Sequence, residues 1–246
     1  MTLPFSVVAW PGKSPARRVV LAAFCFGCAI SAQAAMTLHI RLTTHVENSQ
    51  GNPTARPDNT QEVQVIVGDH YLSVKSGTLE TIFDFVKRRR YAIDLKAARY
   101  VDYSLFDTVG FRVTEMQSRQ GLVRALAAIK LASTPVDVVY NEQALSVIAV
   151  PGEKLDATVE GGELIFAIDG KTLLRRSSVE TPVGAHDAAG LATYLRYTAG
   201  GHPLVLDQLA GAHAIPAQWT LSFQDAGSRQ TRRYELVSAV MEAPAN

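Results

Sequence analysis

The chain has 246 residues, of which 47% are hydrophobic and 19% are charged, and its formal net charge is +1. A chain of this length can bury a hydrophobic core without disulfide bonds or structural metal ions. The near-neutral balance of charges excludes the strongly basic class of nucleic-acid-binding proteins, because binding the phosphate backbone requires a positive surface. We therefore expect a globular protein that has no nucleic-acid partner.

Residues 1–34 are predicted to be a cleaved export signal. Lys13, Arg17 and Arg18 form a positive region, a mostly apolar run of twelve residues follows, and Ala32-Gln33-Ala34 supplies the small-x-small pattern of a cleavage site. A membrane span is the alternative, but about 20 apolar residues are needed to cross a bilayer. We expect a periplasmic or secreted protein whose membrane association is at most peripheral.

Removal of this signal would change the composition of the remaining chain, residues 35–246. The 212 residues that remain contain no cysteine, so neither a disulfide nor a cysteine-ligated metal site is expected. Three positive residues and no acidic residue are lost, so the formal charge moves from +1 to −2. No linker rich in Pro, Gly and Ser interrupts these residues, which favours a single domain.

The predicted elements begin with a strand at 36–46, where Leu38, Ile40 and Leu42 alternate with more polar residues. A loop follows at 47–60. Residues 61–103 then predict an antiparallel meander, because short runs rich in Val, Ile, Tyr and Phe alternate with turn signals. The five expected strands of this meander are 62–67, 70–75, 81–86, 91–95 and 100–103.

Tight turns centred on Arg88-Arg89 and Ala97-Ala98 would set the register of the last three strands. They would place Val86 opposite Tyr91 and Leu95 opposite Tyr100. One face would then carry Ile82, Val86, Tyr91, Ile93, Leu95 and Tyr100, and the other Phe83, Phe85, Ala92, Val101 and Tyr103. A sheet that shows one side to water should alternate apolar and polar residues. We therefore expect either helices on both faces or a strongly curved sheet with a helix in its hollow.

Apolar residues between 104 and 132 recur at spacings of three and four, which is typical of a helix. They are Phe106, Val109, Val113, Met116, Val123, Leu126 and Ala127. Gln120-Gly121 interrupts the stripe, so the segment would be one broken helix or two helices. This stripe would cover one face of the sheet.

The second half of the chain is expected to return to strands and then to add two helices. The strands are 136–140, 144–150, 156–159, 163–168 and 172–176. Asp169-Gly170 predicts a hairpin turn, Asp187 would cap a helix that Gly200-Gly201 stops, and Pro203 would begin a second one. A last hairpin would end in a strand at 232–240. This order of elements belongs to the α+β class.

One stretch of the meander carries a family resemblance. Ile82-Phe83-Asp84 precedes a basic turn, Tyr91-x-Ile93-Asp94 follows, and Lys96-x-x-Arg99-Tyr100 leads into the predicted helix. The pattern resembles the lipoprotein-carrier (Lol carrier-like) half-barrel proteins of bacterial envelopes, including related exported families of unknown function. The resemblance implies a curved antiparallel sheet wrapped around helices, with acyl chains or another apolar ligand in its hollow. The loop at 47–60 and the helix pair at 187–211 depart from the carrier pattern.

The motifs of metal and catalytic sites are missing from the sequence. The histidines are His39, His45, His70, His186, His202 and His213, and none stands in a metal-binding spacing. His202-Pro203 fits a capping turn between two helices. There is no nucleophile elbow and no phosphate-binding glycine loop, although a triad assembled from distant residues stays open. We expect no metal, no cofactor and no catalytic residue.

The basic turn at 87–90 and two acidic residues leave alternatives open. The turn would be either a solvated hairpin tip or a contact for anionic lipid headgroups or an acidic partner. Asp84 and Asp102 share a face, and they would pair with each other or with Arg or Lys side chains.

Together these observations predict a periplasmic binding protein, not an enzyme, that holds a lipid, an acyl chain or another apolar ligand in the hollow of a half-barrel. The candidate ligand-binding residues are Phe83, Phe85, Tyr103, Phe106, Val109, Val113 and Met116. The alternative is an envelope structural or protein-interaction module whose core fills itself and binds no ligand. A hydrolase-like enzyme has no supporting motif.

Overall fold

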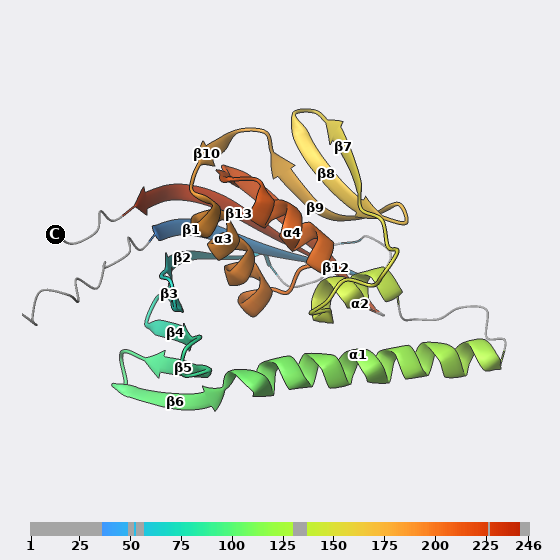
Figure 1. The fold of residues 1–246 in the computed structure, drawn as a ribbon, viewed down its shortest axis with the longest axis horizontal. Coiled ribbons are helices and arrows are strands. Elements are labelled where there is room, and N and C mark those ends of the chain that lie inside the picture. The colour runs from blue at the N-terminus through green and yellow to red at the C-terminus, as the bar shows by residue number, and fades with distance from the viewer. Residues whose placement is uncertain (1–35, 49–51, 53–56, 130–136, 226, 242–246) are drawn as a thin grey trace, which may run out of the picture. The chain divides into compact units, whose positions relative to one another are not determined.

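The computed structural model describes residues 36–48, 52, 57–129, 137–225 and 227–241 (Figure 1). The predicted signal at 1–34 and most of the loop at 47–60 lie outside the described residues. The helices are α1 (Leu105–Ala128), α2 (Val138–Leu145), α3 (Ala185–Thr198) and α4 (Pro203–Gly211). A small sheet pairs β10 (Glu180–Pro182) with β11 (Ala214–Pro216).

A large antiparallel sheet of eleven strands holds the rest of the described chain together. Its strands are β1 (Met36–Asn48), β2 (Asn59–Val67), β3 (Tyr71–Ser76), β4 (Leu79–Asp84), β5 (Arg89–Asp94), β6 (Arg99–Ser104), β7 (Asp156–Glu160), β8 (Glu163–Ile168), β9 (Lys171–Ser177), β12 (Gln218–Asp225) and β13 (Ser228–Met241). Their order is β6-β5-β4-β3-β2-β1-β13-β12-β9-β8-β7. The predicted α+β class with a large antiparallel sheet is confirmed.

The pairing of β1 with β13 joins two meanders into this one sheet. β1 begins the described chain and β13 ends it, and the pairing runs from Met36 opposite Met241 to Asn48 opposite Ser228. β1 also pairs with β2 along nine positions. The first and last described strands therefore lie at the middle of the sheet, where each has neighbours on both sides.

One face of the sheet carries the helices, and we call it the inner face. Gly190 of α3 packs on Val67 of β2, and Gln143 of α2 donates to the carbonyl of Leu173 in β9. α4 packs beside α3. Figure 1 shows α3 and α4 over the β1–β13 region, and α1 continuing directly from β6. The core of the protein lies between the inner face and these helices.

The buried side chains alternate along the strands, as expected for a sheet with one covered face. Leu38 and Ile40 of β1 are fully buried, and they face the same side as Val65 and Val63 of β2. Tyr234 of β13, which pairs with Leu42, is buried on the same side. The other face of β1 and β2 is polar and includes the exposed ion pair Arg41–Glu62. Among the described residues no helix covers this outer face, so helices on both faces are not observed.

The register of β4, β5 and β6 differs from the prediction. Tyr91 pairs with Ile82 instead of Val86, and Tyr100 pairs with Ile93 instead of Leu95. The turns begin earlier than expected, so Val86 and Leu95 lie in the turns and are exposed. Both shifts are by an even number of residues, so the predicted division of side chains between the two faces is retained.

The cause of these shifts is a four-residue turn that occurs twice. Asp84 accepts a hydrogen bond from the backbone N–H of Lys87 at 2.8 Å, and Asp94 accepts one from Ala97 at 2.9 Å. The last residue of each turn, Arg88 or Ala98, has a positive φ of 56° or 50°. An aspartate at the start of a turn favours this hydrogen bond, and it fixes where the preceding strand ends.

The strands predicted at 136–140 and 144–150 are wrong within the described residues. Residues 138–145 form α2, and Asp137 accepts a hydrogen bond from the N–H of Tyr140 at the start of this helix. Residues 146–150 form no strand. The Val-rich sequence suggested β structure, but burial of Tyr140 and Gln143 against the sheet favours the helix.

The predicted helices agree with the structure better than the strands predicted at 136–140 and 144–150. α1 is continuous through Gln120-Gly121, so the predicted break is wrong, and residues 130–132 lie outside the described chain. α3 starts at Ala185 with Gly184 as its N-cap, so Asp187 lies in the first turn instead of capping the helix. The hairpin at Asp169-Gly170 is confirmed, as is the capping turn at His202.

Candidate functional site: a hollow on the inner face

Three adjoining cavities lie along the inner face, and together we call them the hollow. The first, of about 200 Å³, lies between α1 and α2 and is lined by Met116, Arg119, Gln120, Val123, Arg124, Val138 and Asn141. The second, of about 340 Å³, is lined by Val46, Arg119, Tyr140, Asn141, Ala144, Ala199, Phe223, Gln224, Ser228, Gln230 and Arg232. The third, of about 390 Å³, is lined by Leu42, Thr44, Asn59, Gln61, Val63, Val74, Ser76, Tyr194, Thr198, Gln230, Arg232 and Tyr234.

Shared lining residues connect these cavities. Arg119 and Asn141 line both the first and the second, while Gln230 and Arg232 line both the second and the third. The hollow therefore runs from the space between α1 and α2 to the inner face of β1, β2 and β3.

Arginine is the only charged residue type among the residues that line the hollow. Arg119, Arg124 and Arg232 contribute the charges, and no carboxylate appears in any of the three linings. The walls are otherwise apolar side chains, hydroxyls and amides. Such a lining suits an apolar group together with a negative charge.

Arg232 stands at the junction of the second and third cavities, on β13. The strand alternates, so Arg232 shares the inner face with Gln230 and with Tyr234. Its guanidinium donates to the carbonyl of Ala199 at 3.3 Å and lies 5.0 Å from the centre of the Phe223 ring. All these partners are neutral.

The two arginines of α1 that point toward the other helices have different surroundings. Arg119 is paired with Glu115 at 2.8 Å and donates to the side chain of Asn141 at 2.5 Å. Arg112 donates to the carbonyl of Arg196 at 2.5 Å, and burial lowers the pKa of its guanidinium. These contacts connect α1 to α2 and α3.

Tyr234 forms the floor of the hollow near Arg232. Its ring stacks on Trp219 with a centroid distance of 5.2 Å and an interplanar angle of 4°. Burial raises the pKa of the Tyr234 hydroxyl to about 12, although the neighbouring Arg232 acts in the opposite direction. The phenol is therefore neutral at ordinary pH.

Only one of the predicted ligand-binding residues, Met116, lines the hollow. Phe83 is buried core, and with Phe85 it packs on Tyr197 of α3 at ring distances of 5.2 and 5.4 Å. Phe85 and Tyr197 instead border a separate cavity of about 510 Å³ beside β3, α3 and α4. That cavity has mixed charge, including Asp69 and Arg196, and Phe83 does not line it.

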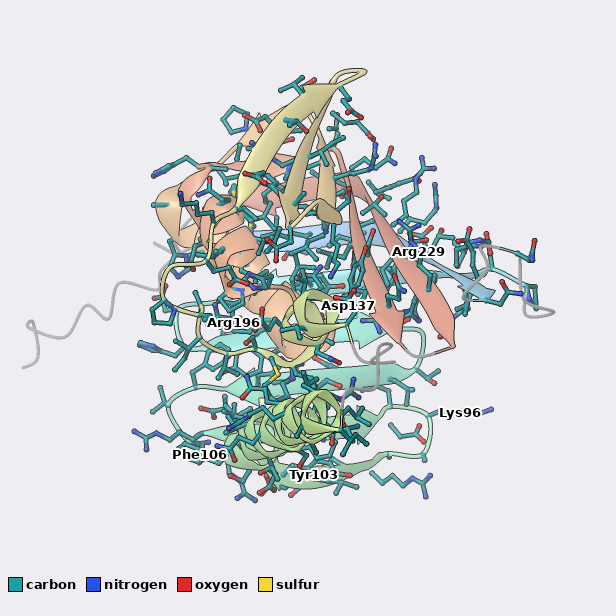
Figure 2. The ribbon with its side chains drawn as sticks, turned by 90° about the vertical axis from the view of Figure 1, so that its right-hand side faces the viewer. Lys96, Tyr103, Phe106, Asp137, Arg196 and Arg229 are labelled. Carbon is teal, nitrogen blue, oxygen red and sulfur yellow. The ribbon has the colours of Figure 1, made fainter. Side chains whose placement is uncertain are left out.

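The remaining predicted residues lie at or near the junction of β6 and α1. Tyr103 is covered by the guanidinium of Arg90, 4.6 Å from its ring centre. Phe106 is 60% exposed and Val113 is 37% exposed, and neither lines a described cavity; Val109 is half-buried. In Figure 2, where α1 is seen nearly end-on, Phe106 and Tyr103 lie beside this helix and below Arg196.

The predicted stripe mixed two sides of α1. Apart from Glu115, the less exposed positions form a seam along the helix at alternating spacings of four and three: Leu105, Val109, Arg112, Met116, Arg119, Val123 and Leu126. Phe106 and Val113 each come directly after one of these less exposed residues in the sequence, so their side chains are turned away from them, toward the outer side of the helix. Including arginine among the seam residues would have found the correct side, because long basic side chains can cover apolar surface.

The basic turn and the two aspartates form exposed ion pairs within the sheet. Asp102 pairs with Arg89 at 2.7 Å, and Asp84 lies 3.8 Å from Lys87. Arg88 lies over the ring of Phe106 at 5.7 Å. The aspartates therefore pair with basic side chains and not with each other.

A second arrangement that could concern chemistry joins Glu142, Glu153 and His202. One ligand atom from each lies within 4.8 Å of the others, a spacing that could suit a metal ion. His202 is fully buried, and its Nε2 atom lies 3.1 Å from Glu153 and 3.7 Å from Glu142.

The protonation of His202 argues against metal binding in this geometry. Its Nδ1 atom accepts a hydrogen bond from the N–H of Leu204 at 3.3 Å, as the N-cap of α4. A neutral imidazole whose Nδ1 accepts carries its proton on Nε2, and a protonated nitrogen cannot ligate a metal. Burial, and after it the neighbouring Glu142, raises the pKa of the Glu153 carboxyl, so a proton competes with a metal ion for this group.

Two comparisons of the sequence, with protein-family models and with curated proteins, give no match. No protein-family model matches the chain, and no curated protein matches it in sequence. Among the described helices none is long and apolar enough to cross a membrane. The resemblance to the lipoprotein-carrier proteins therefore stays a prediction.

Proposed function

We propose that the protein is a periplasmic binding protein that holds the acyl chain of a lipid, or another apolar ligand, in the hollow. It binds and shields this ligand without catalysing a reaction. The predicted export signal supports the location, and the connected cavities of about 200, 340 and 390 Å³ support the binding role.

The observation that carries the proposal is the connection of the three cavities through shared lining residues. Beyond the hollow, the inner face is also incompletely covered. Leu79 of β4 and Val101 of β6 share this face with Thr81, Ala92 and the buried Phe83, as the pairing register requires. They are nevertheless 61% and 51% exposed. In a core that α1 filled completely, both side chains would be buried, so apolar surface is left for another molecule.

The alternative is a protein-interaction module of the envelope. It is favoured by the outer side of α1, which exposes large apolar side chains to solvent. Phe106 and Val113 lie on one flank of α1, Phe111 and Leu122 lie on the other, and Ile129 is the C-cap. A partner protein would cover this outer side and leave the hollow free.

The test is to purify the exported protein without detergent and to analyse a solvent extract by mass spectrometry. We expect about one acyl-bearing lipid per protein molecule, and the delipidated protein should take up a fluorescent fatty-acid analogue. An extract without lipid, combined with no uptake of the analogue, would contradict the binding role. Pull-down of one defined protein by the lipid-free form would then support the alternative.

A further inference from the structure

We propose that the ligand of the hollow is an amphiphile with an anionic headgroup, a carboxylate or a phosphate, and that the guanidinium of Arg232 binds this headgroup. This inference rests on the proposed function. It adds the chemical class of the ligand and the side chain that recognises it.

The first step of the argument is the charge of the hollow. Its charged lining residues are arginines, and acidic residues near α1 do not line it. A positive charge taken partly out of water is costly unless an anion compensates it. A neutral apolar ligand would leave this cost in place, whereas an anionic headgroup would remove it.

The second step separates Arg232 from the other arginines of the hollow. Arg119 is already neutralised by Glu115 at 2.8 Å. Arg124 is exposed and donates to the carbonyl of Gln120 in its own helix. Arg232 is half-buried and forms no ion pair with any described residue.

The third step is the hydrogen-bonding capacity of Arg232. A guanidinium has five N–H donors in a planar fork that fits a carboxylate or a phosphate. One N–H of the Arg232 guanidinium donates to the carbonyl of Ala199, and the Tyr234 hydroxyl is a second polar neighbour. The Phe223 ring lies against the guanidinium. These neutral contacts hold the guanidinium in place and leave donors for a ligand.

The position of Arg232 also fits the two parts of an amphiphile. It lines both the second and the third cavity, so a headgroup at Arg232 lies where the two meet. The third cavity continues along apolar side chains of β1, β2 and β3, namely Leu42, Val63 and Val74. An acyl chain attached to the headgroup would lie along these residues.

The experiment compares four single-chain ligands with the delipidated full-length mature protein. Palmitate carries a carboxylate, hexadecyl phosphate and lysophosphatidate carry a phosphate, and hexadecanol is neutral. Displacement of a fluorescent hydrophobic probe gives the dissociation constants. We expect at least one anionic class to bind about tenfold or more tightly than hexadecanol, because the free energy of a charge-assisted hydrogen bond corresponds to a difference of this size in the dissociation constant. Comparing palmitate with the two phosphate ligands shows whether the preferred headgroup is a carboxylate or a phosphate.

The decisive variant is Arg232→Gln, with Arg233→Gln as its matched control. Arg233 is the next residue, lies on the other face of β13, is paired with Glu235 and is 53% exposed. Arg232→Gln should weaken binding of the preferred anion about 10- to 100-fold and leave hexadecanol binding unchanged. Arg233→Gln should change neither, and Arg232→Lys should restore part of the anion preference. Thermal unfolding followed by circular dichroism checks that the variants are folded.

The outcomes distinguish the two proposals. If no amphiphile binds the unaltered protein, the proposed function fails. If hexadecanol binds as tightly as both anionic classes, the binding function holds but the anionic headgroup is refuted. If Arg232→Gln is folded and weakens anionic and neutral ligands equally, Arg232 is not the headgroup-binding residue.

Discussion

Gly190 of α3 lies so close to Val67 of β2 that a methyl group on Gly190 would overlap the Cγ1 atom of Val67. Val67 is buried, so its side chain has little room to move away. We predict that Gly190→Ala lowers the free energy of unfolding by about 1–3 kcal/mol, because it forces α3 away from the sheet. Urea unfolding followed by circular dichroism measures this change.

The matched control is Gly110→Ala in α1. A Cβ at Gly110 meets no atom within 4 Å, so the substitution adds helix propensity without overlap. Stability should stay the same or rise by up to about 1 kcal/mol. Equal losses in both variants would show that the contact between Gly190 and Val67 is not the cause.

Gln143 is a second residue on which the packing of the helices depends. It is fully buried; its amide donates to the carbonyl of Leu173 at 3.0 Å, and its side-chain oxygen accepts from the N–H of His202 at 2.7 Å. Gln143→Leu would leave two buried backbone groups unpaired, so we expect a loss of about 2–4 kcal/mol in the free energy of unfolding. Chemical denaturation provides the measurement.

Gln117→Leu serves as the control for this substitution. Gln117 also lies in a helix, α1, but its side chain is exposed. We expect a change within about 0.5 kcal/mol. If Gln143→Leu were equally mild, the bonds that join α2 to β9 and to the start of α4 would not contribute as inferred.

The raised pKa of Glu153 predicts how stability depends on pH. Below its ordinary value of 4.5, Glu153 is protonated in both the folded and the unfolded state. As the pH rises, the unfolded state loses this proton first, so the folded state becomes less stable until its own carboxyl ionises. The contribution is therefore present at low pH and is lost above 4.5.

The variant Glu153→Gln removes this titration while Glu142 and His202 remain. Unfolding free energies between pH 4 and pH 7 should fall more steeply for the unaltered protein than for the variant. Parallel curves for the two proteins would mean that Glu153 does not titrate abnormally in the folded state.

Filling the hollow should prevent ligand binding. Val74 of β3 lines the third cavity, where the acyl chain is placed, whereas Val113 lies on the outer side of α1. Val74→Trp should reduce uptake of a fluorescent fatty-acid analogue by about tenfold or more, because the indole occupies ligand space. Val113→Trp should leave uptake unchanged. A loss of uptake in Val113→Trp alone would instead place the binding site on the outer side.

The strands were accessible to sequence reasoning where alternation is regular, as in β1 and in the hairpin at Asp169-Gly170. The register of β4 and β5 could not be predicted from the sequence, because it depends on a hydrogen bond of the Asp84 side chain. Asp84 bonds to the backbone of Lys87 and ends β4 before Phe85. Similarly, Asp137 starts α2 in a segment whose valines favour a strand.

The candidate site was less predictable than the fold. Arg232 reaches the hollow only because β13 pairs with β1, and these two strands lie at opposite ends of the described chain. Met116 was found because it lies on the regular seam of α1. Phe83 was predicted to bind ligand because it lies on an apolar face of the meander, but it is core because Tyr197 of α3, a distant segment, packs on it.

The strands β4, β5 and β6 begin at positions 79, 89 and 99 and are joined by the same aspartate-led turn. β4 and β5, each with the turn that follows it, are thus ten-residue modules in which an aspartate ends the strand and starts the turn. Duplicating or deleting two modules together would keep the direction in which β6 leads into α1 and would lengthen or shorten this part of the sheet without altering the residues that hold α2, α3 and α4. The width of the sheet beside the hollow could change in this way during evolution, to suit ligands of different length, while the central strands stayed the same.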